Sequence, residues 1–113
     1  MEGPDPGSVV SFVQSVAVLA LPAEAQVAWL TASRSPYADE LALQFDDGFR
    51  LLPVFVERGW LRDTAVPALA RLDEHLDAMS CQAHADLWTV EALNRVEWER
   101  TRSLALSALI RIA

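Results

Sequence analysis

The chain has 113 residues, the size of one domain, and its hydrophobic content of 52% excludes an intrinsically disordered protein. Sixteen acidic and nine basic residues give a formal charge of −7, which argues against nucleic acids and anionic membranes as partners because both select cationic surfaces. A single cysteine, Cys81, excludes a disulfide within the chain and is typical of a reducing compartment.

The most apolar stretch, residues 9–21, has the features of neither a membrane span nor a secretory signal. Its 13 residues include Ser11, Gln14 and Ser15, whereas a spanning helix needs about 20 apolar residues. The residues that precede it are acidic and turn-forming, whereas a signal peptide begins with basic residues. We therefore expect a cytoplasmic protein whose first helix is buried.

The beginning of the chain predicts two helices. Residues 1–7 contain two prolines and two glycines and are expected to form a flexible lead-in. Ser8 is then a candidate N-cap for a helix over residues 9–19, since a serine hydroxyl can accept a hydrogen bond from the first turn. Pro22 suits the first turn of a second helix that ends near residue 32.

Residues 37–52 give the clearest helical signal in the sequence. Apolar residues recur there at intervals of three or four, which places them on one face of a helix: Tyr37, Leu41, Phe45, Gly48 and Leu52. Pro53 should end or kink this helix, because proline lacks the N–H and clashes with the preceding turn. One further turn over residues 54–58 is expected to stop at Gly59.

The second half of the chain predicts two more helices, over residues 66–79 and 97–112, with a short helical turn at residues 90–94 between them. Either Asp63 or Thr64 is expected to cap the first of these helices. Residues 80–86 are polar and are expected to form a loop. No segment alternates apolar and polar residues over more than a few positions, so no sheet is expected.

Together these patterns predict an all-α fold, a single-domain helical bundle of four main helices plus one or two short helices. The helical domain is expected to span residues 8–113. Residues that recur on one face of each predicted helix should build one core: Phe12, Val16, Val27, Leu30, Leu41, Phe45, Leu52, Leu69, Leu72, Leu76 and Leu109.

Potential metal ligands gather in residues 73–86. Asp73 and Asp77 are four residues apart on one helix face, so they could hold Mg²⁺ through water. His75, Cys81 and His84 could approach a zinc ion. Neither set is closed, and a charged stripe opposite a leucine stripe is the ordinary pattern of a solvated helix face. We expect no metal site and no cofactor.

The sequence also lacks the groups that catalysis needs. Cys81 and His84 could form a nucleophile and base, but no third residue that would orient the histidine is evident. The four glycines are scattered, so no glycine-rich phosphate loop is present. We therefore expect a protein without enzymatic activity.

Two columns of carboxylates follow the polar side of the predicted helix over residues 37–52. Asp39 and Asp46 form one column and Glu40 and Asp47 the other, because residues seven apart lie on the same side of a helix. Leu43 lies between the columns and points away from the predicted core. An exposed leucine among carboxylates resembles the anchor and polar rim of a protein interface. The alternative is a solvated acidic face with one incidental leucine.

The four tryptophans, Trp29, Trp60, Trp88 and Trp98, are many for a chain of this length. Tryptophan is enriched in cores and at interface hot spots. Trp60 and Trp88 adjoin predicted turns and are expected to fold back onto the core, so at least three of the four should be structural.

Four ordered motifs and a tryptophan resemble a group of small helical bacterial proteins that we associate with immunity to polymorphic or contact-dependent toxins. The motifs are YADELALQFDD at residues 37–47, GWL at 59–61, LDEHLDAMS at 72–80 and LWTVEAL at 87–93, followed by Trp98. The resemblance covers residues 27–110 and supplies no functional residues. It implies an acidic binding protein that blocks a toxin, and the cleft of a nuclease toxin is basic.

Two hypotheses about function follow from the sequence. In the first, the protein binds a basic protein partner, such as a toxin domain, through Asp39, Glu40, Leu43, Asp46 and Asp47. In the second, it is a structural protein that forms a homodimer through its first helix, since the apolar residues of that helix cover more than one face.

Overall fold

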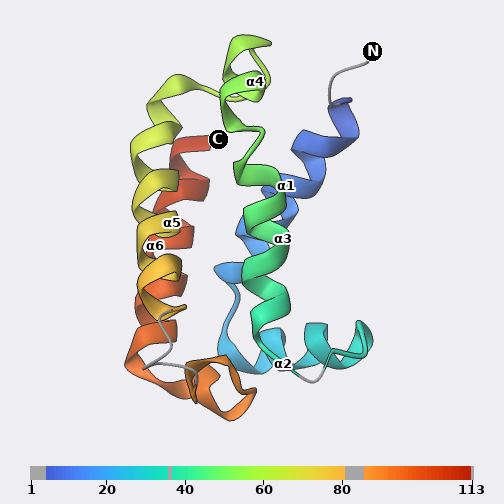
Figure 1. Cartoon of the computed structure of the whole chain (residues 1–113), viewed down its shortest axis with the longest axis vertical. Coiled ribbons are helices and arrows are strands. Elements are labelled where there is room, and N and C mark those ends of the chain that lie inside the picture. Colours follow the sequence, from blue (N-terminus) through green and yellow to red (C-terminus); the bar gives the residue numbers. More distant parts are fainter. Residues whose placement is uncertain (1–4, 36, 81–85, 113) are drawn as a thin grey trace.

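The computed structural model describes residues 5–35, 37–80 and 86–112, and within them the protein is all-α, as predicted (Figure 1). Its elements in chain order are α1 (Pro6–Leu19), α2 (Ala23–Ala32), α3 (Asp39–Phe49), α4 (Leu52–Glu57), the 3-10 helix η1 (Asp63–Ala65), α5 (Val66–Met79), the 3-10 helix η3 (Glu91–Asn94) and α6 (Val96–Ile112). Five helices in these ranges have ten or more residues, one more than the four main helices expected, because α2 is a full helix of ten residues.

The first helix begins earlier than predicted. α1 starts at Pro6, and the Asp5 carboxylate accepts a hydrogen bond from the Ser8 N–H at 3.1 Å. Asp5 is therefore the N-cap, and proline occupies the first turn, where its missing N–H costs nothing. The predicted cap at Ser8 is wrong, and so is the assignment of Pro6 and Gly7 to a lead-in. Residues 1–4 lie outside the described ranges.

α3 is shorter at both ends than the helix predicted over residues 37–52. Tyr37 precedes α3 and is 59% exposed, so its assignment to the apolar stripe is wrong. The helix ends at Phe49, because the ring of Pro53 would clash with the carbonyl four residues before it. Pro53 instead lies in the first turn of α4.

Gly59 ends α4 as predicted. Its φ is +74°. The Gly59 N–H donates to the Val56 carbonyl, and the Trp60 N–H donates to the Phe55 carbonyl at 2.9 Å. Glycine adopts this left-handed conformation without steric cost, so the last carbonyls of the helix gain donors.

The second half of the chain largely follows the sequence. α5 matches the predicted range of 66–79, and α6 begins one residue before the predicted 97. Neither Asp63 nor Thr64 caps α5, because residues 63–65 form η1 and Ala65 takes the capping position.

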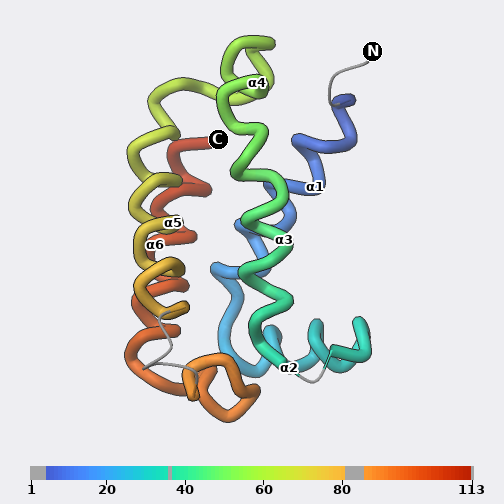
Figure 2. The backbone as a smooth tube through the Cα atoms, viewed as in Figure 1, coloured from blue at the N-terminus to red at the C-terminus, as the bar shows by residue number. Residues whose placement is uncertain are grey.

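α1 runs behind α3 (Figure 2) and packs against both α3 and α6, while α5 pairs with α6. Nine of the eleven predicted core residues are buried, whereas Val27 and Leu109 are half-buried. No helix in the described ranges is long and apolar enough to cross a membrane.

The contact between α1 and α3 requires a glycine. A Cβ atom added to Gly48 would lie 2.4 Å from Cδ1 of Phe12, which is closer than packed carbon atoms approach. The Phe12 ring also packs against Phe45, with 5.4 Å between ring centroids, and against Phe55 at 5.9 Å. Gly48 thus allows α3 to lie close to α1 over this aromatic cluster.

One polar network is buried where α1, α2 and α6 meet. Gln26 is fully buried and donates to the carbonyls of Val18 and Leu19, both at 3.1 Å. Its carbonyl oxygen accepts from Arg102 Nη1 at 3.0 Å, and Nη1 also donates to the Leu93 carbonyl. The network supplies hydrogen bonds to the end of α1, where helical carbonyls lack partners within the helix.

Candidate functional site

The five predicted binding residues all belong to α3, but the neighbouring helices divide them between two hollows. Asp39, Leu43 and Asp46 face α5, whereas Glu40 and Asp47 face α1. Leu43 is 52% exposed, as the helical wheel predicted. The two carboxylate columns therefore border different hollows, and the exposed Leu43 lies between the columns.

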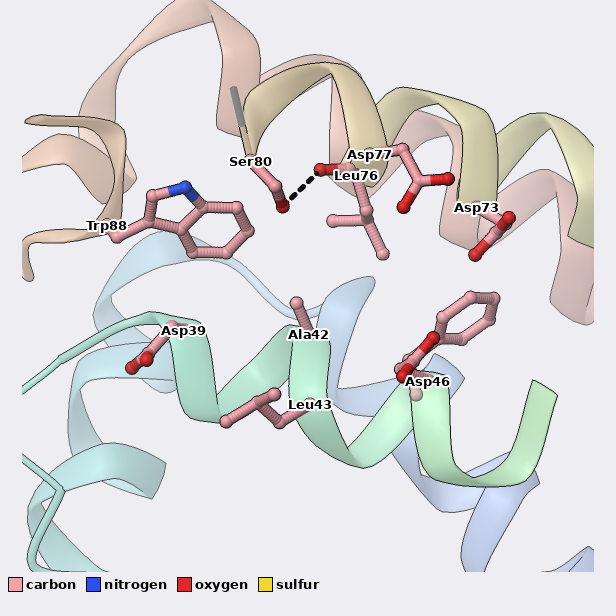
Figure 3. Close-up of a pocket in the computed structure, with 10 residues that line it drawn as sticks. Asp39, Ala42, Leu43, Asp46, Asp73, Leu76, Asp77, Ser80 and Trp88 are labelled. Carbon is pink, nitrogen blue, oxygen red and sulfur yellow. Dashed lines mark hydrogen bonds between the residues drawn. The ribbon is translucent and has the colours of Figure 1, made fainter. Parts of the chain in front are cut away.

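The first hollow lies between α3 and α5 and has a volume of about 570 Å³; we call it the α3–α5 groove. α3 and α5 run in opposite directions along it (Figure 1). Its walls combine carboxylates with apolar and aromatic side chains (Figure 3). The lining residues are Asp39, Ala42, Leu43, Phe45, Asp46, Asp73, Leu76, Asp77, Ser80 and Trp88.

Trp88 closes one end of the α3–α5 groove and is firmly held there. Its indole N–H donates to the Met79 carbonyl at 2.8 Å, and its ring meets Trp98 edge to face with 5.6 Å between centroids. Trp98 is itself fully buried and donates to the Leu87 carbonyl at 2.7 Å. These contacts fix an aromatic surface beside Asp39, as Figure 3 shows.

Four carboxylates line the α3–α5 groove, and none of its ten lining residues is basic. Burial, which disfavours the charged form, is the main cause that raises the pKa of Asp73, and repulsion from Asp77, Asp46 and Glu74 adds to it. Asp46 pairs with Arg50 at 2.8 Å, but this ion pair is exposed and carries little energy. The groove is therefore a negatively charged surface whose charge a cation would relieve.

The second hollow, the α1–α3 groove, has a volume of about 420 Å³ and a more polar lining. It contains Glu40 and Asp47 together with the hydroxyl-bearing residues Ser8 and Ser11 of α1. Gln44 donates to the Glu40 carboxylate at 3.4 Å across one helical turn. The lining of the α1–α3 groove has two carboxylates, whereas that of the α3–α5 groove has four, and it includes no tryptophan.

The residues considered as metal ligands are not brought together. In the described ranges, no group of three or more histidine, cysteine and carboxylate side chains could hold a metal ion. His75 Nε2 lies 2.9 Å from the Glu97 carbonyl and so takes part in the contact between α5 and α6. Cys81 and His84, the other candidates for a zinc site or a catalytic pair, lie outside the described residues.

The sequence analysis did not predict that residues of α5 line the groove. Asp73 and Asp77 were expected to belong to a solvated face, and Trp88 to the core. Asp73 and Trp88 are half-buried and Asp77 is exposed, and all three line the groove opposite α3. The spacing of Asp73 and Asp77 by four residues was the available signal, but it does not show which helix lies opposite.

Comparison with known proteins assigns no family to the chain. No family model, no curated protein and no solved structure matches it.

Proposed function

We propose that this protein is a non-catalytic binding protein that holds a basic segment of a protein partner in the α3–α5 groove. The observation that carries the proposal is the convergence of four carboxylates from two helices on a groove with an apolar floor. Carboxylates alone would select any cation, whereas Trp88 adds the aromatic surface typical of interface hot spots and Leu43 adds an exposed apolar contact.

The resemblance to immunity proteins suggests a basic toxin domain as the partner. Blocking a toxin requires occupation of its cleft and no chemistry. The net charge of −7 would accelerate association with such a cleft through long-range attraction. We propose toxin neutralisation in the cytoplasm as the role of the protein.

The alternative, self-association through α1, has less support. The apolar residues that suggested it pack inside the bundle: Phe12, Val16 and Leu19 are buried, and Val9 and Val13 pack against the core. Val10, at 54% exposure, is the large apolar residue of α1 that stays open to solvent. The contacts of α1 with α3 and α6 thus account for its apolar character.

The proposal is tested by calorimetric titration with toxin domains encoded beside the gene. Reversing two groove charges, Asp39→Arg with Asp77→Arg, should weaken binding by roughly 100-fold or more, because like charges across an interface cost several kcal/mol. The matched control, Glu40→Arg with Asp47→Arg, changes the net charge equally in the α1–α3 groove and should weaken binding far less. Leu43→Asp should also reduce affinity.

Two results would contradict the proposal. Equal losses from both pairs of reversals would mean that overall charge, and not the α3–α5 groove, determines binding. Absence of binding to every such domain would refute toxin neutralisation.

A further inference from the structure

The charges of the α3–α5 groove are arranged along its length. Asp39 lies beside Trp88 at one end, and Asp46 and Asp73 lie at the other (Figure 3). Between these ends lie the apolar residues Ala42, Leu43 and Leu76, with Ser80 between Trp88 and Leu76 and Asp77 between Leu76 and Asp73. A ligand that fits this pattern carries two positive charges separated by an apolar segment.

The spacing of the charges matches an α-helix. Asp39 and Asp46 are seven residues apart on α3, which is about 10 Å at 1.5 Å per residue. A partner helix that lies along the groove presents residues at i and i+7 at this same separation and on one face. In an extended chain about 10 Å corresponds to three residues, and side chains three apart point to opposite faces. The groove therefore favours a helical ligand over an extended one.

Resting on the proposed function, we infer that the α3–α5 groove binds an amphipathic α-helix of its partner, which carries two arginine or lysine residues seven positions apart and an apolar side chain between them. One basic residue lies against Asp39 and the face of Trp88, and the other against Asp46 and Asp73. The apolar residue contacts Leu43 and Leu76. This is the recognition of a helix in a groove, with charges at both ends that fix its register.

A second copy of this chain is a poor ligand for the groove. Its nine basic residues are all arginines, and only Arg95 and Arg102 are seven positions apart. Arg95 pairs with Asp86, and Arg102 donates to Gln26 and to the Leu93 carbonyl. The net charge of −7 also opposes contact between two acidic grooves. The charges therefore point to a different, basic protein.

The test uses three synthetic alanine-rich peptides of 15 residues, titrated into the full-length protein by calorimetry at low salt. The first has arginines seven positions apart and a leucine between them. The second has the same composition with the arginines five positions apart, which puts them on different faces of a helix. The third is the first peptide with a central proline, which breaks the helix.

We expect the first peptide to bind at least 10-fold more tightly than the other two. The variant Asp39→Asn with Asp73→Asn should abolish this preference, whereas the matched control Glu40→Gln with Asp47→Asn should retain it. Equal binding of all three peptides would overturn the inference, as would a dimer in analytical ultracentrifugation that the groove variant dissociates.

The outcomes separate this inference from the proposed function. A toxin domain that loses affinity on charge reversal in the groove, while the three peptides bind equally, would leave the proposed function standing and refute the helical ligand. Discrimination among the peptides without binding to any toxin domain would support the helical ligand and refute toxin neutralisation.

Discussion

Replacing Gln26 by leucine should remove much of the stability of the fold. Leucine fits the volume but can neither donate to the carbonyls of Val18 and Leu19 nor accept from Arg102. Both carbonyls lose the glutamine donor. The Val18 carbonyl keeps its hydrogen bond from the Leu21 N–H, so the Leu19 carbonyl is the one left unsatisfied. An unsatisfied buried carbonyl costs about 1–3 kcal/mol, and a lost bond to a charged group about 1.5–3 kcal/mol.

The expected total for Gln26→Leu is about 3–5 kcal/mol, a large part of the roughly 5–15 kcal/mol by which a domain is stable. For 113 residues, an unfolding entropy of about 2.1 cal/mol/K per residue converts this loss into a fall in Tm of about 15 °C. Thermal unfolding followed by circular dichroism measures the shift, and urea unfolding should give an unchanged slope.

A control variant and a double-mutant cycle test this prediction further. Gln14→Leu changes an exposed glutamine of α1 and should alter stability by less than about 0.5 kcal/mol. Combining Gln26→Leu with Arg102→Leu should cost less than the two single changes together, because the residues share one network. A Gln26→Leu protein that melts within a few degrees of the parent would refute the reasoning.

Two further predictions concern the α1–α3 contact and the groove charges. Gly48→Ala should destabilise the protein by about 1–3 kcal/mol in thermal unfolding despite the better helix propensity of alanine, because the added Cβ would overlap the Cβ, Cγ and Cδ1 atoms of Phe12. Asp73→Asn should stabilise the protein at pH 7 by about 0.5 kcal/mol, since it removes a charge that burial disfavours and that Asp77 and Asp46 repel. Because the folded-state pKa of Asp73 is raised, its charge destabilises the fold above that pKa. The gain in stability should vanish below the ordinary Asp pKa of 3.8, where Asp73 is protonated in both the folded and the unfolded state. Urea unfolding should therefore show the gain at pH 7 and none at pH 3.

The sequence predicts this fold well where a stripe of apolar residues and a stop signal coincide. α5 matches its predicted range, and Gly59 ends α4 in the conformation expected. The predicted start of α1 was wrong because Asp5 acts as the N-cap and Pro6 occupies the first helical position, so the helix begins before Ser8. The end of α3 was wrong because the effect of Pro53 acts on Phe49, four residues before it.

The candidate site could be predicted only in part. A helical wheel correctly separates the column of Asp39 and Asp46 from that of Glu40 and Asp47, and it leaves Leu43 exposed. It treats the helix as isolated, however, and so does not show that α5 lies beside the first column and α1 beside the second. The contribution of Asp73 to the groove depends on how α3 and α5 pack, which is a property of the tertiary structure.

The packing of α1 on α6 has a consequence for the synthesis of the protein. α1 leaves the ribosome before α6, yet α6 is one of the two helices that pack most extensively on it, more than seventy residues later in the chain. Until Val96–Ile112 has emerged, the side of α1 that packs on α6 stays exposed in the nascent chain. Such long-range closure slows folding and leaves apolar surface open to chaperones. We therefore expect a ribosome-stalled chain that lacks α6 to remain sensitive to protease, and resistance to appear only when α6 is released.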